Sequence, residues 1–135
     1  MSAASNYLEN KVLDHVLTAT AYTQPSTRYL ALFTNTSGSA AANLEAGTLT
    51  DEVSGGSYAR QTVTFAAASG GSSATNATVT FPAATANWGT ITHVAVMDAS
   101  SSGNVLFWGA VTTSKTIETG DTFQVTSGNL TISLA

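Results

Sequence analysis

Short apolar or alternating runs, separated by turn-forming residues, recur along most of this sequence. Turn signals such as SSSGN, ETGD and TSGN come about every 8–12 residues, and no helix-forming segment stands between successive runs. This pattern predicts one mainly β domain over residues 1–135: an antiparallel β-sandwich, jelly-roll or Ig-like, with a Greek-key barrel as the alternative. The expected strands cover residues 28–34, 58–65, 77–82, 91–99, 105–111, 122–126 and 130–134.

The segment before these runs has helical periodicity. Apolar residues recur at helical spacing, and Asn6 with Glu9 three positions later is typical of a capping box. We therefore expect one N-terminal helix over residues 6–18, ending before Pro25. Its apolar stripe needs a partner, either the sheet of the same chain or a neighbouring subunit. The stripe consists of Leu8, Val12, Leu13, Val16 and Leu17.

The run RYLALFT differs from the other expected strands because it hardly alternates. A nearly continuous apolar run is typical of a strand that is covered on both faces. The segment that follows, residues 35–51, is polar and rich in small residues. We expect a long, flexible loop there.

Charged residues make up only 9% of the 135 residues, and the net charge is −4. Nucleic acids and anionic membranes are bound by clustered cations, and the four basic residues of this chain are scattered. We therefore expect no nucleic-acid or membrane partner. The N-terminus lacks the basic and apolar regions of a signal peptide, which favours synthesis in a host cytoplasm without export.

The sequence contains no recognisable catalytic pattern. Gly55 and Gly56 precede an alternating segment without a following Lys-Ser/Thr, so we interpret them as a turn before a strand and not as a phosphate loop. His15 and His93 have no supporting nucleophile pattern and are expected in a core or an interface. Cysteine is absent, which excludes thiolate chemistry. We expect no enzyme activity and no cofactor.

Metal binding is not expected either. Asp51 and Glu52 adjoin at the end of the predicted loop and could hold a weak Ca²⁺. Calcium takes six to eight oxygen ligands, usually from several carboxylates on one short loop. Two carboxylates do not meet that demand.

Several aromatic and basic residues are candidates for an interface. Arg60 could pair with a carboxylate across the sheet or across a subunit contact, with Tyr58 beside it on the same strand face. Trp88 stands in a loop before Gly89 and is expected to be exposed, as an interface anchor or as a sugar platform, whereas Trp108 is expected in the core. The interface candidates are Tyr7, Leu8, Tyr22, Tyr58, Arg60 and Trp88.

Four blocks of the sequence resemble a family of small structural proteins of tailed bacteriophages, including tail-fibre-like proteins. The blocks are NYLENKVLDHVL with AYTQPSTRYLALFT, then EVSGGSYARQTVTF, then TVTFPAATANWGTITHVAVMDA, then GNVLFWGAVTTSKTIETGDTFQVTSGNLTISL. The resemblance covers residues 6–134. It implies a non-enzymatic component of the virion, located on the capsid surface or in the tail.

Two locations in the virion remain open at this point. A compact domain of this size cannot span far, so we place capsid decoration, as a cement protein bound to the major capsid protein, ahead of a tail component. The alternative is a tail fibre or tail-tip protein that binds a host receptor or carbohydrate. In either location the expected partners are other virion proteins and copies of the chain itself, with a trimer among the arrangements considered.

Overall fold

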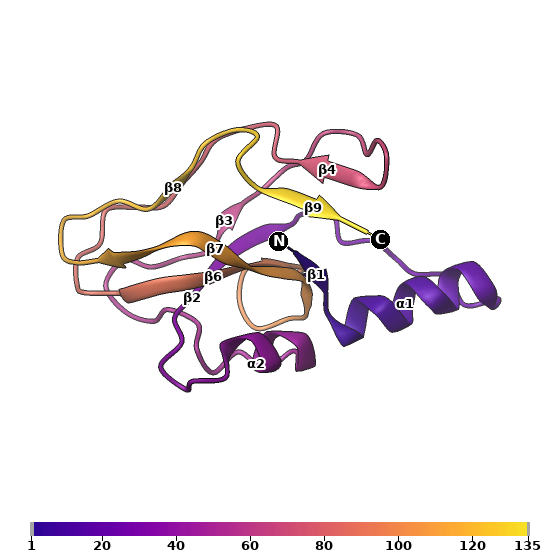
Figure 1. Cartoon of the computed structure of the whole chain (residues 1–135), viewed down its shortest axis with the longest axis horizontal. Coiled ribbons are helices and arrows are strands. Elements are labelled where there is room, and N and C mark those ends of the chain that lie inside the picture. The colour runs from indigo at the N-terminus through magenta and orange to yellow at the C-terminus, as the bar shows by residue number, and fades with distance from the viewer. Residues whose placement is uncertain (1, 135) are drawn as a thin grey trace.

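A five-stranded antiparallel sheet forms the centre of the molecule (Figure 1). The computed structural model describes residues 2–134, and the strand order in this sheet is β1-β7-β6-β2-β3. The mainly β, antiparallel fold is therefore confirmed. The five strands are β1 (Ala3–Ala4), β7 (Val105–Ile117), β6 (Gly89–Met97), β2 (Tyr29–Phe33) and β3 (Gln61–Thr62).

Two short strand pairs lie over one face of this sheet, and helix α2 (Ala40–Ala46) lies on the other face (Figure 1). The resulting architecture is sandwich-like, as the turn spacing predicts. The strand pairs are β4 (Ser72–Ala74) with β9 (Thr131–Ser133), and β5 (Val79–Thr80) with β8 (Gln124–Val125).

Strand β2 supplies side chains to two separate apolar clusters. Leu30 and Leu32 belong to the larger cluster, beneath the strand pairs. Ala31 and Phe33 belong to the smaller one, which includes Leu44 of α2. All four β2 residues are completely buried. The continuous apolar run therefore reflects a strand that is covered on both faces, as predicted.

The segment predicted as a loop, residues 35–51, contains α2. Its sequence AAANLEA combines good helix formers with one anchor, Leu44, which is almost fully buried. Gly47 ends the helix in the left-handed conformation at φ 81°. Asp51, at the end of the segment, is buried and accepts hydrogen bonds from Ser37.

The predicted N-terminal helix is confirmed as α1 (Asn6–Leu17), but its cap is Ser5 and not Asn6. The Oγ of Ser5 accepts a hydrogen bond from the Leu8 backbone N–H at 3.3 Å and donates one to the Val105 carbonyl. Ser5 is fully buried. The cap therefore also fixes the start of α1 to the central sheet.

Candidate interaction surface

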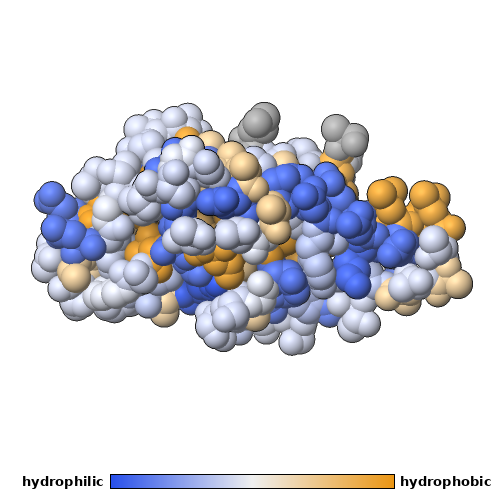
Figure 2. All heavy atoms as spheres, turned by 90° about the horizontal axis from the view of Figure 1, so that it is seen from below, coloured by the Kyte–Doolittle hydropathy of each residue, from blue (hydrophilic) through white to orange (hydrophobic). Residues whose placement is uncertain are grey.

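Helix α1 extends away from the sheets (Figure 1). The later residues of its apolar stripe are exposed to solvent. Exposure rises along the helix, from 37% at Val12 through 54% at Leu13 to 69% at Val16 and 73% at Leu17. Figure 2 shows the corresponding apolar atoms gathered at one end of the molecule. An exposed contiguous apolar patch of this kind typically marks an interaction site.

The opposite side of α1 is held by the segment that returns from the helix to β2. The backbone N–H of Tyr22 donates to Nδ1 of His15 at 3.0 Å. Lys11 lies over the ring of Tyr7, with Nζ 5.7 Å from the ring centre. The helix and the return segment thus form one arm. Asp14 and His15 stay exposed, as do the apolar residues Val16 and Leu17 of the same turns.

A groove continues the apolar surface from α1 onto the sheets. It has a volume of about 540 Å³, and Leu8, Val12 and Leu13 line it on the helix side. Leu134, which is 58% exposed, lines it on the side of β9. Among the described residues, the exposed large apolar side chains are therefore confined to α1 and Leu134. We call Val12, Leu13, Val16, Leu17 and Leu134 the arm patch.

Three of the predicted interface residues attach the arm to the sheets through the larger apolar cluster. Leu8 is buried in the larger cluster, and Tyr7 and Tyr22 pack against that cluster while remaining partly exposed. Burial is the main cause that raises the pKa of the Tyr22 hydroxyl above its ordinary value. The residues that contact solvent are the later members of the same stripe. Helical spacing identifies the stripe, but it does not show which of its residues pack against the sheets.

Arg60 and Tyr58 belong to a buried polar network. Arg60 Nε donates to Oε2 of Glu52, and Nη2 donates to Oε1, both at 2.7 Å. Its Nη1 donates to the carbonyls of Ala99 and Ser102, both at 2.8 Å. The predicted carboxylate partner of Arg60 is thus Glu52 of the same chain. With its side chain 2% exposed, Arg60 does not present a charge to a neighbour.

Tyr58 completes this network. Its hydroxyl donates to Glu52 Oε2 at 2.9 Å and accepts from the backbone N–H of Leu32 at 3.1 Å. Burial is the main cause that raises the pKa of the hydroxyl, and the nearby Glu52 carboxylate raises it further. Tyr58 therefore stays protonated and acts as a fixed link between β2 and the segment leading to β3.

Trp88 is buried, contrary to the exposed position expected from its loop. Only 5% of the residue is exposed, and its Nε1 donates to the carbonyl of Gly56 at 2.9 Å. Its ring meets the ring of Tyr58 edge to face, with 5.5 Å between the centres. Trp88 thus belongs to the hydrophobic core, and its ring offers no exposed face on which a sugar could stack. Trp108 is half-buried, and its Nε1 donates to Glu45 of α2 at 2.7 Å.

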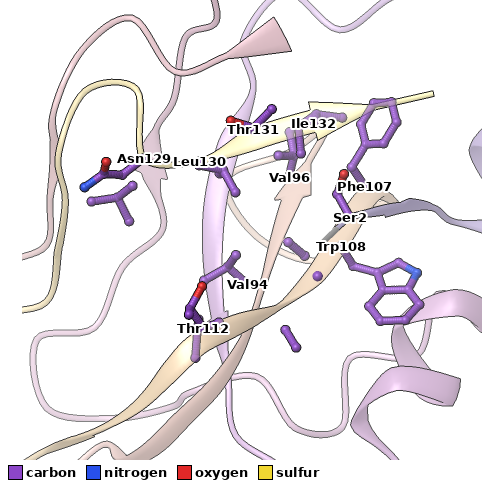
Figure 3. Close-up of a pocket in the computed structure, with 15 residues that line it drawn as sticks. Ser2, Val94, Val96, Phe107, Trp108, Thr112, Asn129, Leu130, Thr131 and Ile132 are labelled. Carbon is purple, nitrogen blue, oxygen red and sulfur yellow. The ribbon is translucent and has the colours of Figure 1, made fainter. Parts of the chain in front are cut away.

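A second surface feature is a hollow of about 260 Å³ between the central sheet and the β8–β9 segment (Figure 3). Val94, Val96, Leu130 and Ile132 form its apolar part. Ser2, Thr112, Asn129 and Thr131 supply polar groups. None of its 15 lining residues is an acid, a base or a histidine, so the hollow holds no group for proton transfer.

The described residues, 2–134, contain no group of three or more His, Cys, Asp or Glu side chains placed to hold a metal ion. Within the same range, no helix combines the length and the apolar character needed to cross a membrane. His93 lies beside Trp108, and burial lowers the pKa of its imidazole. Its Nδ1 shares a hydrogen bond with the hydroxyl of Thr92 at 2.8 Å.

Comparison with known proteins gives one result that covers almost the whole chain. No curated protein matches the sequence. The family described as "Podophage GP4 fiber I protein gp80" matches residues 3–133, a range that includes α1 and both sheet layers. This chain therefore belongs to the podophage GP4 fiber I protein gp80 family, whose members are fibre-like structural proteins of the phage virion.

Proposed function

We propose that this chain is a building unit of a podophage tail fibre, and that it acts by binding other virion proteins without catalysing a reaction. The observation that carries the proposal is the family match over residues 3–133. The match includes the arm as well as the sheets, which supports assigning the proposed role to the domain as a whole.

The geometry supports a binding role. Buried Arg60 pairs with the partly buried Glu52, and the carboxylate of buried Asp51 accepts hydrogen bonds from the hydroxyls of Ser37 and Thr36. Such groups stabilise a fold and are not available to a substrate. The arm patch, by contrast, is apolar and accessible, which suits contact with another protein surface.

The family favours the fibre over the capsid surface, which reverses the order given by sequence analysis. That order rested on the compact size of the domain. A compact unit can equally belong to a fibre when several units are joined, because length then comes from assembly. The receptor-binding form of the fibre hypothesis loses its main support, since Trp88 is buried.

Immunogold labelling of intact virions tests the fibre assignment. An antibody against the purified chain should decorate the fibres, and labelling should disappear from particles that lack the gene. Labelling spread over the head would contradict the fibre role and support capsid decoration. A cryo-electron microscopy map of the virion, into which the 135-residue domain is fitted, gives an independent second measurement.

A further inference from the structure

An apolar hollow of about 310 Å³ lies between the central sheet and the β4–β9 pair, and one cation, Arg28, lines it. We propose that this hollow binds a small amphipathic carboxylate, that is, an aliphatic chain that ends in a carboxylate group. The chain occupies the hollow, and the carboxylate pairs with Arg28. Its volume is at the lower end of the range for small-molecule sites. This inference goes beyond the proposed function and does not depend on where the protein lies in the virion.

The apolar wall of the hollow comes from both layers of the fold. Strands β6 and β7 contribute residues on one side, β9 on the other, and the segment after β3 adds a phenylalanine. The apolar wall residues are Phe65, Val96, Leu106, Phe107, Ile132 and Leu134. Three of them, Phe65, Phe107 and Ile132, pack against the larger apolar cluster but remain partly exposed. An aliphatic ligand covers the surface that these side chains leave accessible, which is favourable.

Arg28 is the one charged residue in the lining, and its charge is not neutralised inside the described chain. Its Nη2 donates to Oε1 of the uncharged Gln24 at 2.8 Å. Tyr29 pairs with Met97, so Asp98 is the acid that follows in the register. The Asp98 carboxylate instead accepts from the backbone N–H and the side-chain amide of Asn104, at 2.7 and 2.9 Å. Across residues 2–134, Arg28 forms no ion pair, whereas Arg60 does.

These features together select the class of ligand. A guanidinium binds a carboxylate through two parallel hydrogen bonds, so one arginine suits one carboxylate. A small inorganic anion would lose its water against an apolar wall without compensation. A sugar would need several available polar groups, but the hydroxyl of Ser73 donates to the Ala66 carbonyl at 2.6 Å. The hydroxyl of Ser72 accepts from Ser133 at 3.3 Å.

The neighbouring hollow in Figure 3 provides a comparison within the same molecule. Val96, Phe107 and Ile132 line both hollows, so the two share part of their apolar wall. The hollow of Figure 3 has no charged lining residue. A carboxylate should therefore enter the Arg28 hollow, whereas an uncharged aliphatic molecule has no charge-based reason to prefer it.

An NMR titration of the full chain with sodium octanoate tests the proposal. The signals of Phe65 and Leu106, which line the Arg28 hollow and not its neighbour, should shift and saturate. Octanol has the chain without the charge and should bind at least about ten-fold more weakly, because it loses the charge-assisted hydrogen bonds. Acetate has the charge without the chain and should cause no saturable shift at the same concentrations.

Four variants separate the charge from the apolar wall. Arg28→Met should weaken octanoate binding by at least about ten-fold and leave octanol binding unchanged, and Arg28→Lys should retain part of the preference for octanoate. Lys115→Met removes an exposed cation that lines neither hollow and should change neither affinity. Ser73→Leu adds volume from β4 and should weaken both ligands. Circular dichroism should show that all four variants are folded.

Four results would overturn the proposal. The first is no saturable shift with octanoate at millimolar concentrations, and the second is equal affinity for octanoate and octanol. The third is wild-type affinity for octanoate in Arg28→Met. The fourth is a set of shifts confined to Val16 and Leu17, which would mean binding to the arm patch. The immunogold result is independent of all four, so the ligand site can fail while the fibre role stands, and the reverse also holds.

Discussion

The guanidinium of Arg60 and the carboxylate of Glu52 form a two-pronged ion pair, with both nitrogen–oxygen distances at 2.7 Å. The remaining guanidinium nitrogen holds the loop between β6 and β7 through the carbonyls of Ala99 and Ser102. Burial alone would lower the pKa of Arg60, but the hydrogen bonds and charge of Glu52 outweigh it and raise the pKa. One buried cation thus connects three segments that are distant in sequence.

Replacing Arg60 by Met should lower the free energy of unfolding by about 3 kcal/mol, because the largely buried Glu52 carboxylate keeps its hydrogen bond from Tyr58 but loses its cationic partner. Urea denaturation at a fixed protein concentration measures the change. Arg28→Met is the matched control, since the Arg28 side chain bonds Gln24 at the surface and should contribute less than about 1 kcal/mol. Equal losses in the two variants would show that the network around Glu52 is not a main support of the fold.

The two tryptophans should differ in their access to solvent. In a Trp108→Phe variant, the remaining Trp88 should emit at short wavelength and resist quenching by acrylamide, because it is 5% exposed and bonded to Gly56. In a Trp88→Phe variant, the half-buried Trp108 should be quenched more readily. The reverse order would restore Trp88 as a surface residue and, with it, the sugar-platform hypothesis.

Much of the fold can be predicted from local sequence patterns. The elements that were not predicted share one cause: they depend on contacts between distant parts of the chain. The stretches that became β2 and α1 carry strong local signals: a nearly continuous apolar run in β2, and apolar residues at helical spacing in α1. Strand β4 carries no such signal. Its residues Ser72–Ala74 pair with β9 about 60 positions later, so only the tertiary fold makes this Ser- and Gly-rich stretch a strand.

The candidate interaction surface was likewise predictable only in part. The stripe on α1 can be identified from spacing alone, and so can its need for a partner. Its exposure cannot be predicted from spacing, because it depends on how far the sheets extend along α1. They bury Leu8 in the first turn and leave Val16 and Leu17 in solvent. The burial of Trp88 likewise depends on Gly56, a residue 32 positions away that only the fold brings near.

The glycine pair at 55 and 56 should respond unequally to substitution, although both residues have positive φ angles. A Cβ on Gly56 would lie 2.5 Å from Cβ of Ala86 and 2.6 Å from its backbone nitrogen, whereas one on Gly55 would meet nothing within 4 Å. Gly55→Ala should therefore cost about 1 kcal/mol, for the backbone conformation only. Gly56→Ala should cost at least about twice as much, because the Ala86 backbone must also move. Thermal unfolding of the two variants measures the difference, and equal losses would contradict the close approach of Ala86.

The carboxylate of Asp51 should make the stability of the fold depend on pH in the acid range. Hydrogen bonds from the Ser37 side chain are the main cause that lowers the pKa of Asp51, and the Ser37 backbone N–H and Thr36 hydroxyl add to it. The unfolded chain therefore binds this proton more readily than the folded chain. The stabilisation is complete above the unfolded pKa of about 3.9, and it is lost as the pH falls through the lower folded value.

The difference in unfolding free energy between the wild type and Asp51→Asn isolates this carboxylate from the others. It should be constant near neutral pH and shrink as the pH falls below about 4. Ser37→Ala provides a second readout by NMR titration of the Asp51 carboxyl carbon. Removing the main donor should move the titration midpoint of Asp51 back toward its ordinary value. A midpoint that stays in place in Ser37→Ala, or a difference that grows toward acid pH, would show that these hydroxyls do not hold the carboxylate in its charged form.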